Sequence, residues 1–271
     1  MNSNYPFQIT SKKEFEEFAL DLFQKQIKSN AVYGEFCEHL QVKTKHVKKI
    51  EDIPFLPIQC FKTHDVKSGS FIPEVTFLSS GTTGQTQSKH HVKSLSLYEK
   101  SFTQAFEYFY GPVEDFVILG LLPSYLERKG SSLIYMVDNF IKRSRYTESG
   151  FYLNELKELS ETLIKLDKSG KKILLVGVSF ALLDLIKNTS FHLKNTIVME
   201  TGGMKGRRKE IIREELHRKL SVGFGVEQIH SEYGMTELLS QAYSKGKGIY
   251  DLPETMKIFI RDPEDPLTLY S

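Results

Sequence analysis

Six consecutive small residues are the part of the sequence that most plainly favours a defined chemistry. Four of them carry hydroxyl groups and two are glycines, and they directly follow a predicted buried strand at 74–78. Glycine allows a close backbone approach to an anion, while backbone N–H groups and hydroxyls donate hydrogen bonds to phosphate oxygens. We therefore predict a phosphate-binding loop made of Ser79, Ser80, Gly81, Thr82, Thr83 and Gly84.

The spacing of this loop excludes the Walker A motif. That motif places four residues between its glycines and a Lys after the second one, whereas only Thr82 and Thr83 separate Gly81 from Gly84. A flexible polar loop is the alternative interpretation, but six such residues in a row favour phosphate binding.

A second polar group lies much later in the chain, after a predicted strand at 226–231. Its aromatic ring can stack on a base, its Gly allows close approach, its Thr hydroxyl can reach a phosphate, and its Glu offers Mg²⁺ a hard oxygen ligand. Alone it is a weak signal, because Thr-Glu also begins many helices. Together with the loop it predicts a nucleotide site, and its residues are Tyr233, Gly234, Met235, Thr236 and Glu237.

A competing motif centres on Ser179, which lies between a predicted strand and a predicted helix as the nucleophile of a serine hydrolase would. The position that closes this motif is Ala181 rather than glycine. We expect Ser179 to be the N-cap of the helix instead. We therefore rank a serine hydrolase third, below the functions that use the predicted nucleotide site.

Other groups have simple structural explanations. His90 and His91 could contact phosphate, but exposed polar residues leading into a helix explain them equally well. The basic residues at 205–209 could neutralise pyrophosphate, although a solvated helix start accounts for them. The aromatic residues Phe102, Phe106, Phe109 and Tyr110 fit a core-facing helical stripe.

The elements that must position these groups alternate along the chain. Ser11, with Glu14 completing a capping box, predicts the start of a first helix at 11–28, and a second helix follows at 32–41. Two prolines make 53–58 an extended segment. From residue 95 onward the alternation predicts a parallel α/β sheet. Its strands are expected at 116–122, 171–176, 196–200 and 226–231, and its helices at 95–110, 131–140, 152–168, 180–187 and 208–220.

Composition narrows the class of protein. The 271 residues include 36 Lys and Arg against 34 Asp and Glu, and this near balance gives no reason to expect nucleic acid as a partner. We expect no membrane span, because no apolar run reaches the length that one requires. With no signal-peptide pattern and two cysteines, Cys37 and Cys60, that we expect to stay reduced, a cytoplasmic protein is predicted.

These motifs together resemble the superfamily of adenylate-forming enzymes, which includes acyl-CoA synthetases, peptide synthetases and luciferase. Segment 79–84 resembles its phosphate-binding motif, 233–237 its Y-G-x-T-E motif, and the turn Gly202-Gly203 its adenine-binding turn. More narrowly, segments 53–58, 61–64, 202–210 and 230–241 resemble the LuxE-type acyl-protein synthetases. The similarity runs from about Ile53 to Leu269.

The resemblance implies ATP and Mg²⁺ as cofactors and a role for each motif residue. The loop 79–84 would close over the β- and γ-phosphates, with Thr82 among the catalytic residues. Tyr233 would pack against adenine, where Gly202, Gly203 and Gly234 shape the space and Met235 belongs to the same motif. The catalytic residues Thr236 and Glu237 would contact the α-phosphate and the Mg²⁺, respectively.

The implied fold is α/β, of the adenylate-forming large-domain type, with mostly parallel sheets flanked by helices. It would be a single domain over 1–271 with a helical N-terminal portion at 1–50. Three departures stand out: Gln87 replaces the usual Lys, no ribose-binding Asp is found, and no Cys follows Cys60 as an acyl acceptor. We therefore expect that a C-terminal part of the family pattern is missing.

The implied function is ATP-dependent activation of a carboxylic acid, which the LuxE-type resemblance suggests is fatty. The acyl group would pass to a thiol, to coenzyme A, or to a partner such as an acyl reductase or another acyl-accepting protein. The alternative is a truncated, catalytically inactive relative that keeps nucleotide or partner binding.

Overall fold

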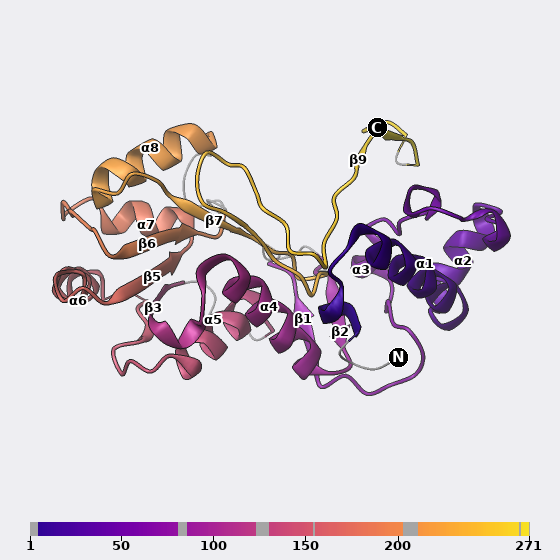
Figure 1. Cartoon of the computed structure of the whole chain (residues 1–271), viewed down its shortest axis with the longest axis horizontal. Helices are drawn as coiled ribbons and strands as arrows, with labels where there is room; N and C mark the ends of the chain where they lie inside the picture. The colour runs from indigo at the N-terminus through magenta and orange to yellow at the C-terminus, as the bar shows by residue number, and fades with distance from the viewer. Residues whose placement is uncertain are drawn as a thin grey trace. The chain divides into compact units, whose positions relative to one another are not determined.

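The computed structural model describes residues 5–80, 86–122, 130–153, 155–202, 211–265 and 267–270, and the chain divides into two compact units (Figure 1). Unit 1 comprises Met1–Tyr98, Met235–Ser240 and Leu252–Ser271, and unit 2 comprises Glu99–Gly234 and Gln241–Asp251. Each unit is described by itself. The single domain over 1–271 stays a prediction.

Unit 2 is built on a six-stranded sheet with the strand order β4-β3-β5-β6-β7-β8, in which every neighbouring pair is parallel except β7 and β8. All six residues of β3 are buried, as expected for a strand covered on both faces. This confirms the predicted α/β fold with a mostly parallel sheet. Its strands are β3 (Phe116–Leu121), β4 (Gly150–Phe151), β5 (Lys172–Gly177), β6 (Thr196–Glu200), β7 (His230–Tyr233) and β8 (Ala242–Ser244).

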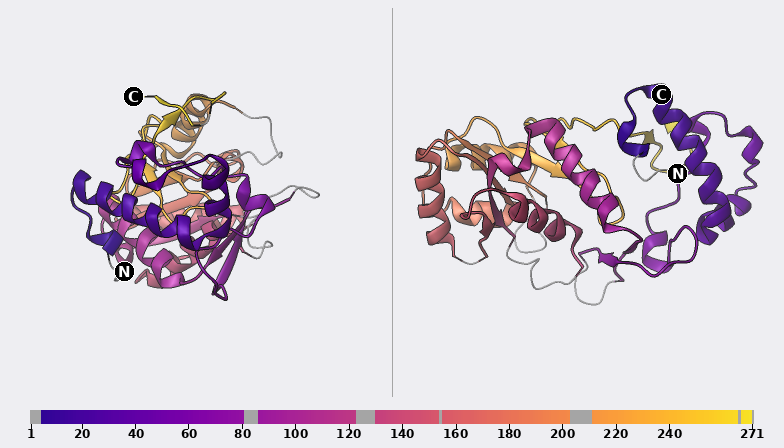
Figure 2. Two further views of the ribbon diagram at one scale, coloured as in Figure 1. Left: turned by 90° about the vertical axis from the view of Figure 1, so that its right-hand side faces the viewer. Right: turned by 60° about the horizontal axis from the view of Figure 1, so that its bottom comes forward.

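Helices cover both faces of this sheet. Because β4 and β5 lie on opposite sides of β3, crossovers of the usual right hand put the helix between β3 and β4 and the helix between β4 and β5 on opposite faces. Phe102 of α4 packs edge-on against Phe140 of α5, with ring centroids 5.4 Å apart, so α4 lies with α5 (Figures 1 and 2). The helices are α4 (Leu95–Tyr110), α5 (Ser132–Arg143), α6 (Leu156–Lys168), α7 (Ser179–Leu185) and α8 (Arg213–Phe224).

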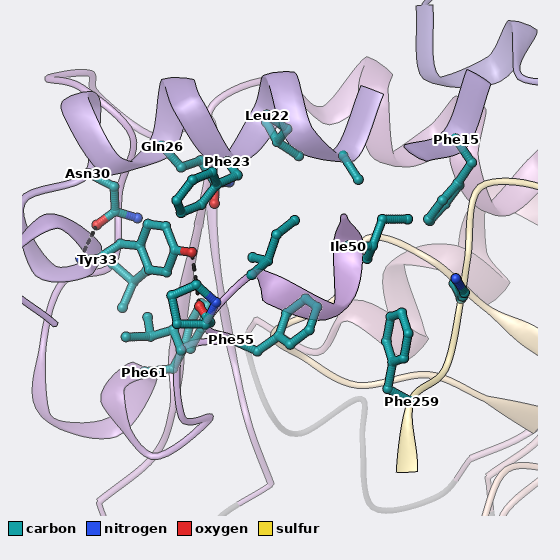
Figure 3. A pocket seen from close by; sticks show the side chains of 16 residues that line it. Phe15, Leu22, Phe23, Gln26, Asn30, Tyr33, Ile50, Phe55, Phe61 and Phe259 are labelled. Carbon is teal, nitrogen blue, oxygen red and sulfur yellow. Dashed lines mark hydrogen bonds between the residues drawn. The ribbon is translucent and has the colours of Figure 1, made fainter. Parts of the chain in front are cut away.

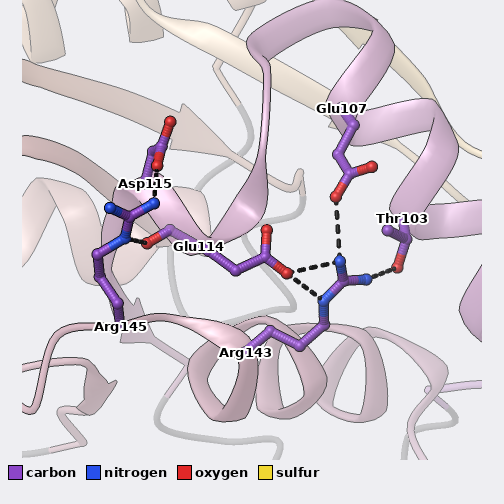
Figure 4. Close-up of polar contacts among 6 residues, drawn as sticks. All are labelled: Thr103, Glu107, Glu114, Asp115, Arg143 and Arg145. Carbon is purple, nitrogen blue, oxygen red and sulfur yellow. Dashed lines mark hydrogen bonds and ion pairs between the residues drawn. The ribbon is translucent and has the colours of Figure 1, made fainter.

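The guanidinium group of Arg143 joins the C-terminal end of α5 to α4 (Figure 4). It donates to Glu114 Oε1 at 2.7 and 3.0 Å, to Thr103 Oγ1 at 2.7 Å and to Glu107 Oε1 at 3.1 Å. Arginine suits this position because its fixed fork of donors can serve several acceptors at once.

We expect Arg143→Ala to lower the free energy of unfolding by about 1–2 kcal/mol, since it leaves the buried Thr103 and the partly buried Glu107 and Glu114 without this donor. Arg145→Ala is the matched control, because Arg145 is 60% exposed against 34% for Arg143 and should cost under about 0.5 kcal/mol. Urea unfolding of both variants measures the difference. Equal losses would contradict the role assigned to Arg143.

Unit 1 joins a helical part to two small antiparallel sheets. Asn30 ends α1 and begins α2, where its Oδ1 accepts from Tyr33 N at 3.2 Å. The two helices share a core made of Phe23, Tyr33, Cys37 and Val47. The elements are α1 (Lys12–Ser29), α2 (Ala31–His39), α3 (Cys60–Thr63), β1 (Val75–Leu78) paired with β2 (Lys89–Val92), and β9 (Ile260–Arg261) paired with β10 (Leu269–Tyr270).

Most of the predicted elements are confirmed, and the errors have local causes. The predicted helix at 208–220 and strand at 226–231 lie too early, because α8 continues to Phe224 and ends at Gly225 in the left-handed conformation, with φ at 66°. In the capping box Ser11 acts as predicted, but Glu14 accepts from Thr10 N at 2.8 Å rather than from Ser11. Strands β2, β4, β8, β9 and β10 were not predicted, because four of them have only two or three residues and β2 has two histidines among its four.

Within the described residues, no helix is long and apolar enough to cross a membrane.

Candidate functional site

Gly202 and Tyr233 lie at neighbouring strand ends in unit 2. Gly202 comes two residues after the end of β6, Tyr233 ends β7, and the two strands pair with Glu200 opposite Ser231. Ligands of open α/β sheets bind beyond the carboxyl ends of the parallel strands, which is the edge reached here. We call Gly202, Tyr233 and Gly234 the candidate adenine set. Gly203 lies outside the described residues.

Tyr233 and Gly202 are both accessible at this strand edge. The side chain of Tyr233 is 38% exposed, and its ring centroid lies 6.1 Å from that of Tyr250. Gly202 has φ at 78°, and a Cβ placed on it would meet nothing within 4 Å. Its backbone is therefore in a glycine conformation and can be approached from outside.

A buried carboxylate supports the Gly202 turn. Glu200 Oε2 accepts from Gly202 N at 2.7 Å and from Ser179 Oγ at 3.1 Å, and His217 Nε2 lies 3.6 Å from the other carboxylate oxygen. Burial raises the pKa of Glu200, but the nearby His217 ring, the Ser231 hydroxyl and the N–H of Gly202 lower it by more, so that pKa lies below its usual value. The turn is thus held by an ionised carboxylate.

The Ser179 hydroxyl has a structural role in this network. Ser179 is 2% exposed and donates to a carboxylate, whereas a hydrolase nucleophile would donate to a histidine nitrogen. The predicted N-cap role is wrong, because Val178 is the N-cap of α7 and Ser179 is the first helical residue. The structure therefore removes the geometric basis for the hydrolase reading.

Next to this network, burial and the charge of Glu200 raise the pKa of Glu232 to about 8. Its carboxyl group is enclosed although the residue as a whole is partly exposed. A Cβ placed on Gly234 would come within 2.4 Å of Glu232 Oε1, so Gly234 is the residue that leaves room for this carboxyl group.

The raised pKa makes stability depend on pH. Between pH 4.5, the pKa of the group in the unfolded chain, and about pH 8, Glu232 keeps its proton in the folded chain and loses it on unfolding. Its contribution to the free energy of unfolding is therefore complete at low pH and is lost as the pH rises. We expect Glu232→Gln to gain on the order of 2–4 kcal/mol relative to the native chain between pH 4.5 and 8.5.

Urea unfolding at several pH values tests this expectation. Burial and the charge of Lys245 lower the pKa of His230 to about 4, which gives the free energy of unfolding an opposite dependence on pH. This contribution cancels in the difference between the two proteins, because both contain His230. The exposed Glu227→Gln serves as control and should follow the native curve. A constant gap between native chain and Glu232→Gln would contradict the raised pKa.

In unit 1, Ser79 closes the base of the predicted phosphate loop. Ser79 N donates to Ser88 O at 3.1 Å, Ser88 N donates to Ser79 Oγ at 2.9 Å, and the amide of Gln87 donates to Ser79 O at 2.7 Å. Gln87, which replaces the Lys of the family pattern, thus holds the loop base. Ser80 follows Ser79, and the remaining loop residues, Gly81, Thr82, Thr83 and Gly84, lie outside the described residues.

Thr236 and Glu237 occupy the two central positions of a tight turn in unit 1, which Leu238 N closes by donating to Met235 O at 3.1 Å. The ring of His90 holds this turn, since its Nδ1 lies 2.8 Å from Thr236 O. Burial lowers the pKa of His90, so the ring is neutral at pH 7 and donates from Nδ1.

His90 is the residue whose role sequence reasoning missed. It and His91 lie in strand β2, not in a polar lead-in to a helix. His91 Nδ1 lies 3.0 Å from Thr76 Oγ1 and its Nε2 lies 3.0 Å from Asp65 Oδ1, so the two rings serve different partners. In a longer strand, the alternation of side chains would have indicated that His90 and His91 point to opposite faces. A strand of four residues is too short for that pattern to be recognised.

We call Ser79, Ser80, Met235, Thr236 and Glu237 the candidate phosphate set. Among the described residues, no group of three or more His, Cys, Asp or Glu side chains is arranged to hold a metal ion. The single carboxylate of Glu237 nevertheless fits Mg²⁺, which is commonly held by one or two carboxylates together with substrate phosphates and water. Its role as a metal ligand stays a prediction.

Comparisons with known proteins add the following findings. A family model described as "Acyl-protein synthetase, LuxE" matches residues 3–266. Two crystal structures of coronafacic acid ligase from Pectobacterium brasiliense, one of them a single-residue mutant form, are each 17% identical to this chain, with TM-scores of 0.38 and 0.40 for the unmutated and mutant forms. The alignments cover 87% and 78% of this chain but only 47% and 39% of the ligases, so the chain spans less than half their length. No curated protein matches it.

Proposed function

This chain belongs to the LuxE acyl-protein synthetase family, and we propose that it activates a carboxylic acid with ATP to form an acyl-adenylate. The proposed substrate is a fatty acid, and the acyl group then passes to a thiol or to an acyl-accepting protein such as an acyl reductase. The residues of the candidate adenine and phosphate sets are proposed to bind the nucleotide.

In the proposed reaction a carboxylate oxygen of the acid attacks the α-phosphorus of ATP. The bond from this phosphorus to the oxygen that bridges to the β-phosphate breaks, and pyrophosphate leaves. No strong base is needed, because the acid is already ionised at pH 7. The task of the chain is to position the two reactants and to balance charge.

The hydrogen bond between His90 and Thr236 is the observation that carries the proposal. His90 lies opposite Phe77 in the β1–β2 pair, and Ser79 follows two residues after Phe77. The base of the loop and the Thr236 turn are therefore fastened to the same small sheet within unit 1. Attachment of the described end of the first motif and of the turn of the second motif to one small sheet supports the proposal of a common phosphate site.

Within this unit, Glu237 is proposed to offer its carboxylate to Mg²⁺, which when bound would neutralise phosphate charge. Thr236 is proposed to donate to the α-phosphate from the adjacent turn position. In unit 2, the partly exposed ring of Tyr233 and the open backbone of Gly202 support the role proposed for the adenine set.

The test is an activation assay with ATP, Mg²⁺ and a panel of fatty and aromatic acids. We expect pyrophosphate release that depends on acid, ATP and Mg²⁺, and hydroxamate formation when hydroxylamine is added. Ser179→Ala should keep this activity. Acyl release that persists without ATP would point to a hydrolase, and nucleotide binding without pyrophosphate release would favour a catalytically inactive relative.

A further inference from the structure

Unit 1 contains an apolar cavity of about 310 Å³ between α1 and the segment around Ile50 to Leu56 (Figure 3). Phe15, Leu22 and Phe23 of α1 form one wall, and Phe55 and Phe259 lie across from them. The volume falls at the lower end of the range of small-molecule sites. Neither the candidate adenine set nor the candidate phosphate set contributes to this lining.

Two of the polar groups that line the cavity, Tyr33 OH and Asn30 Oδ1, are already engaged in hydrogen bonds. Tyr33 OH donates to Pro54 O at 2.9 Å, and Asn30 Oδ1 accepts from Tyr33 N. A polar ligand would gain no hydrogen bond from these two groups, whereas a hydrocarbon would gain from leaving water along the mostly apolar lining.

The lining of the cavity includes one charged side chain. Among the lining residues, all of which belong to the described part of the chain, only Lys257 is charged. Its ammonium group lies 4.7 Å from the centre of the Phe259 ring and 3.5 Å from Glu51 Oε1. Leu22, Phe55 and the Lys257 side chain are 37%, 46% and 29% exposed, so both apolar lining and the cation reach solvent.

We propose that this cavity binds the hydrocarbon chain of a free carboxylic acid, whose carboxylate replaces Glu51 as the partner of Lys257. An apolar interior with a single cation at its rim is complementary to an unbranched monoanionic amphiphile. The identification of this ligand with the acid to be activated rests on the proposed function, and transfer of the acid to the phosphate set is a separate step.

One wall residue links the cavity to the candidate phosphate set. Phe61 lines the cavity, and its ring packs edge-on against His90, with the centroids 6.0 Å apart and the planes at 83°. His90 in turn holds Thr236. An acid in the cavity is therefore separated from the candidate phosphate set by one pair of side chains within the same unit.

Equilibrium binding of octanoic, decanoic, dodecanoic and tetradecanoic acids, without ATP or Mg²⁺, tests the apolar part. We expect Kd to fall roughly fourfold per added methylene until the cavity is filled, and then to level off. Ala19→Phe places a ring in the cavity from α1 and should weaken binding about tenfold or more. Glu17→Phe adds the same ring on the exposed side of α1 and should bind like the native chain.

A rim variant tests the charge without filling the interior. Lys257→Met keeps the apolar stem, and it should remove the native preference for an acid over its methyl ester, which we expect to be roughly threefold or more. Glu51→Gln should strengthen binding of the acid, because it removes the competing carboxylate. Equal binding by Ala19→Phe and Glu17→Phe, or an acid preference that survives in Lys257→Met, would overturn the proposed site.

Failure of this inference and failure of the proposed function give different results. Chain-length-dependent binding that Ala19→Phe abolishes, without ATP-dependent activation by the native chain, would support the cavity and count against acid activation. Activation of long-chain acids that Ala19→Phe leaves unchanged would support activation and overturn the cavity as the acid site.

Discussion

Glu237→Gln should lower acid-dependent exchange between ATP and pyrophosphate by on the order of 10²-fold. The substitution keeps the size of the side chain and removes the negative charge proposed to hold Mg²⁺. The turn that carries it is closed by backbone atoms, Leu238 N and Met235 O, so the local fold should persist. The loss should be partly recovered at high Mg²⁺ concentration, because a weakened ligand set can still be filled by mass action.

Exchange assays over a range of Mg²⁺ concentrations measure this effect, with Glu264→Gln as the control. Glu264 is an exposed carboxylate in the same unit and has no proposed role. We expect the control to match the native chain. Native exchange rates in Glu237→Gln would remove the residue from the metal site.

His90→Phe should lower the exchange rate roughly tenfold or more, while His90→Asn should recover much of the loss. Phenylalanine preserves ring packing against Phe61 but leaves Thr236 O without its donor, so the turn can shift, and small displacements near a reacting centre are costly. Asparagine has an amide N–H that can take the place of Nδ1–H.

This prediction assigns His90 a positioning role, so the readout must separate it from general destabilisation. We expect His91→Phe, which removes the bonds to Thr76 and Asp65, to reduce stability by about 1–2 kcal/mol with little change in exchange. Unfolding curves and kcat are measured for each variant. Equal exchange rates in His90→Phe and His91→Phe would contradict a specific role for His90.

Periodic apolar patterns determined the long elements from sequence. Helix α4 was predicted at its observed bounds, and β3 and β5 were placed within about one residue, because burial on both faces demands a continuous apolar run. Several short elements were not predicted. Strand β2 has four residues, two of them histidines, and a pattern this short cannot be told from a loop.

For the candidate site, the sequence determined which residues belong to the two motifs. It also predicted the family from them, and the match to the family model confirms that family. The sequence also predicted that Gly202 and Tyr233 come just after strands; this is confirmed for Gly202, whereas Tyr233 is the last residue of β7.

Only the tertiary structure decided what supports these residues. The bond from His90 to Thr236, the contacts of the Glu200 carboxylate with Ser179 and His217, and the cavity that Lys257 borders all join segments distant in the chain. Such contacts depend on the distance and direction of side chains after packing, and a local pattern of residue types carries neither. The same limit explains the error at Ser179, whose hydroxyl would cap α7 by local rules but instead meets a buried carboxylate from the next strand.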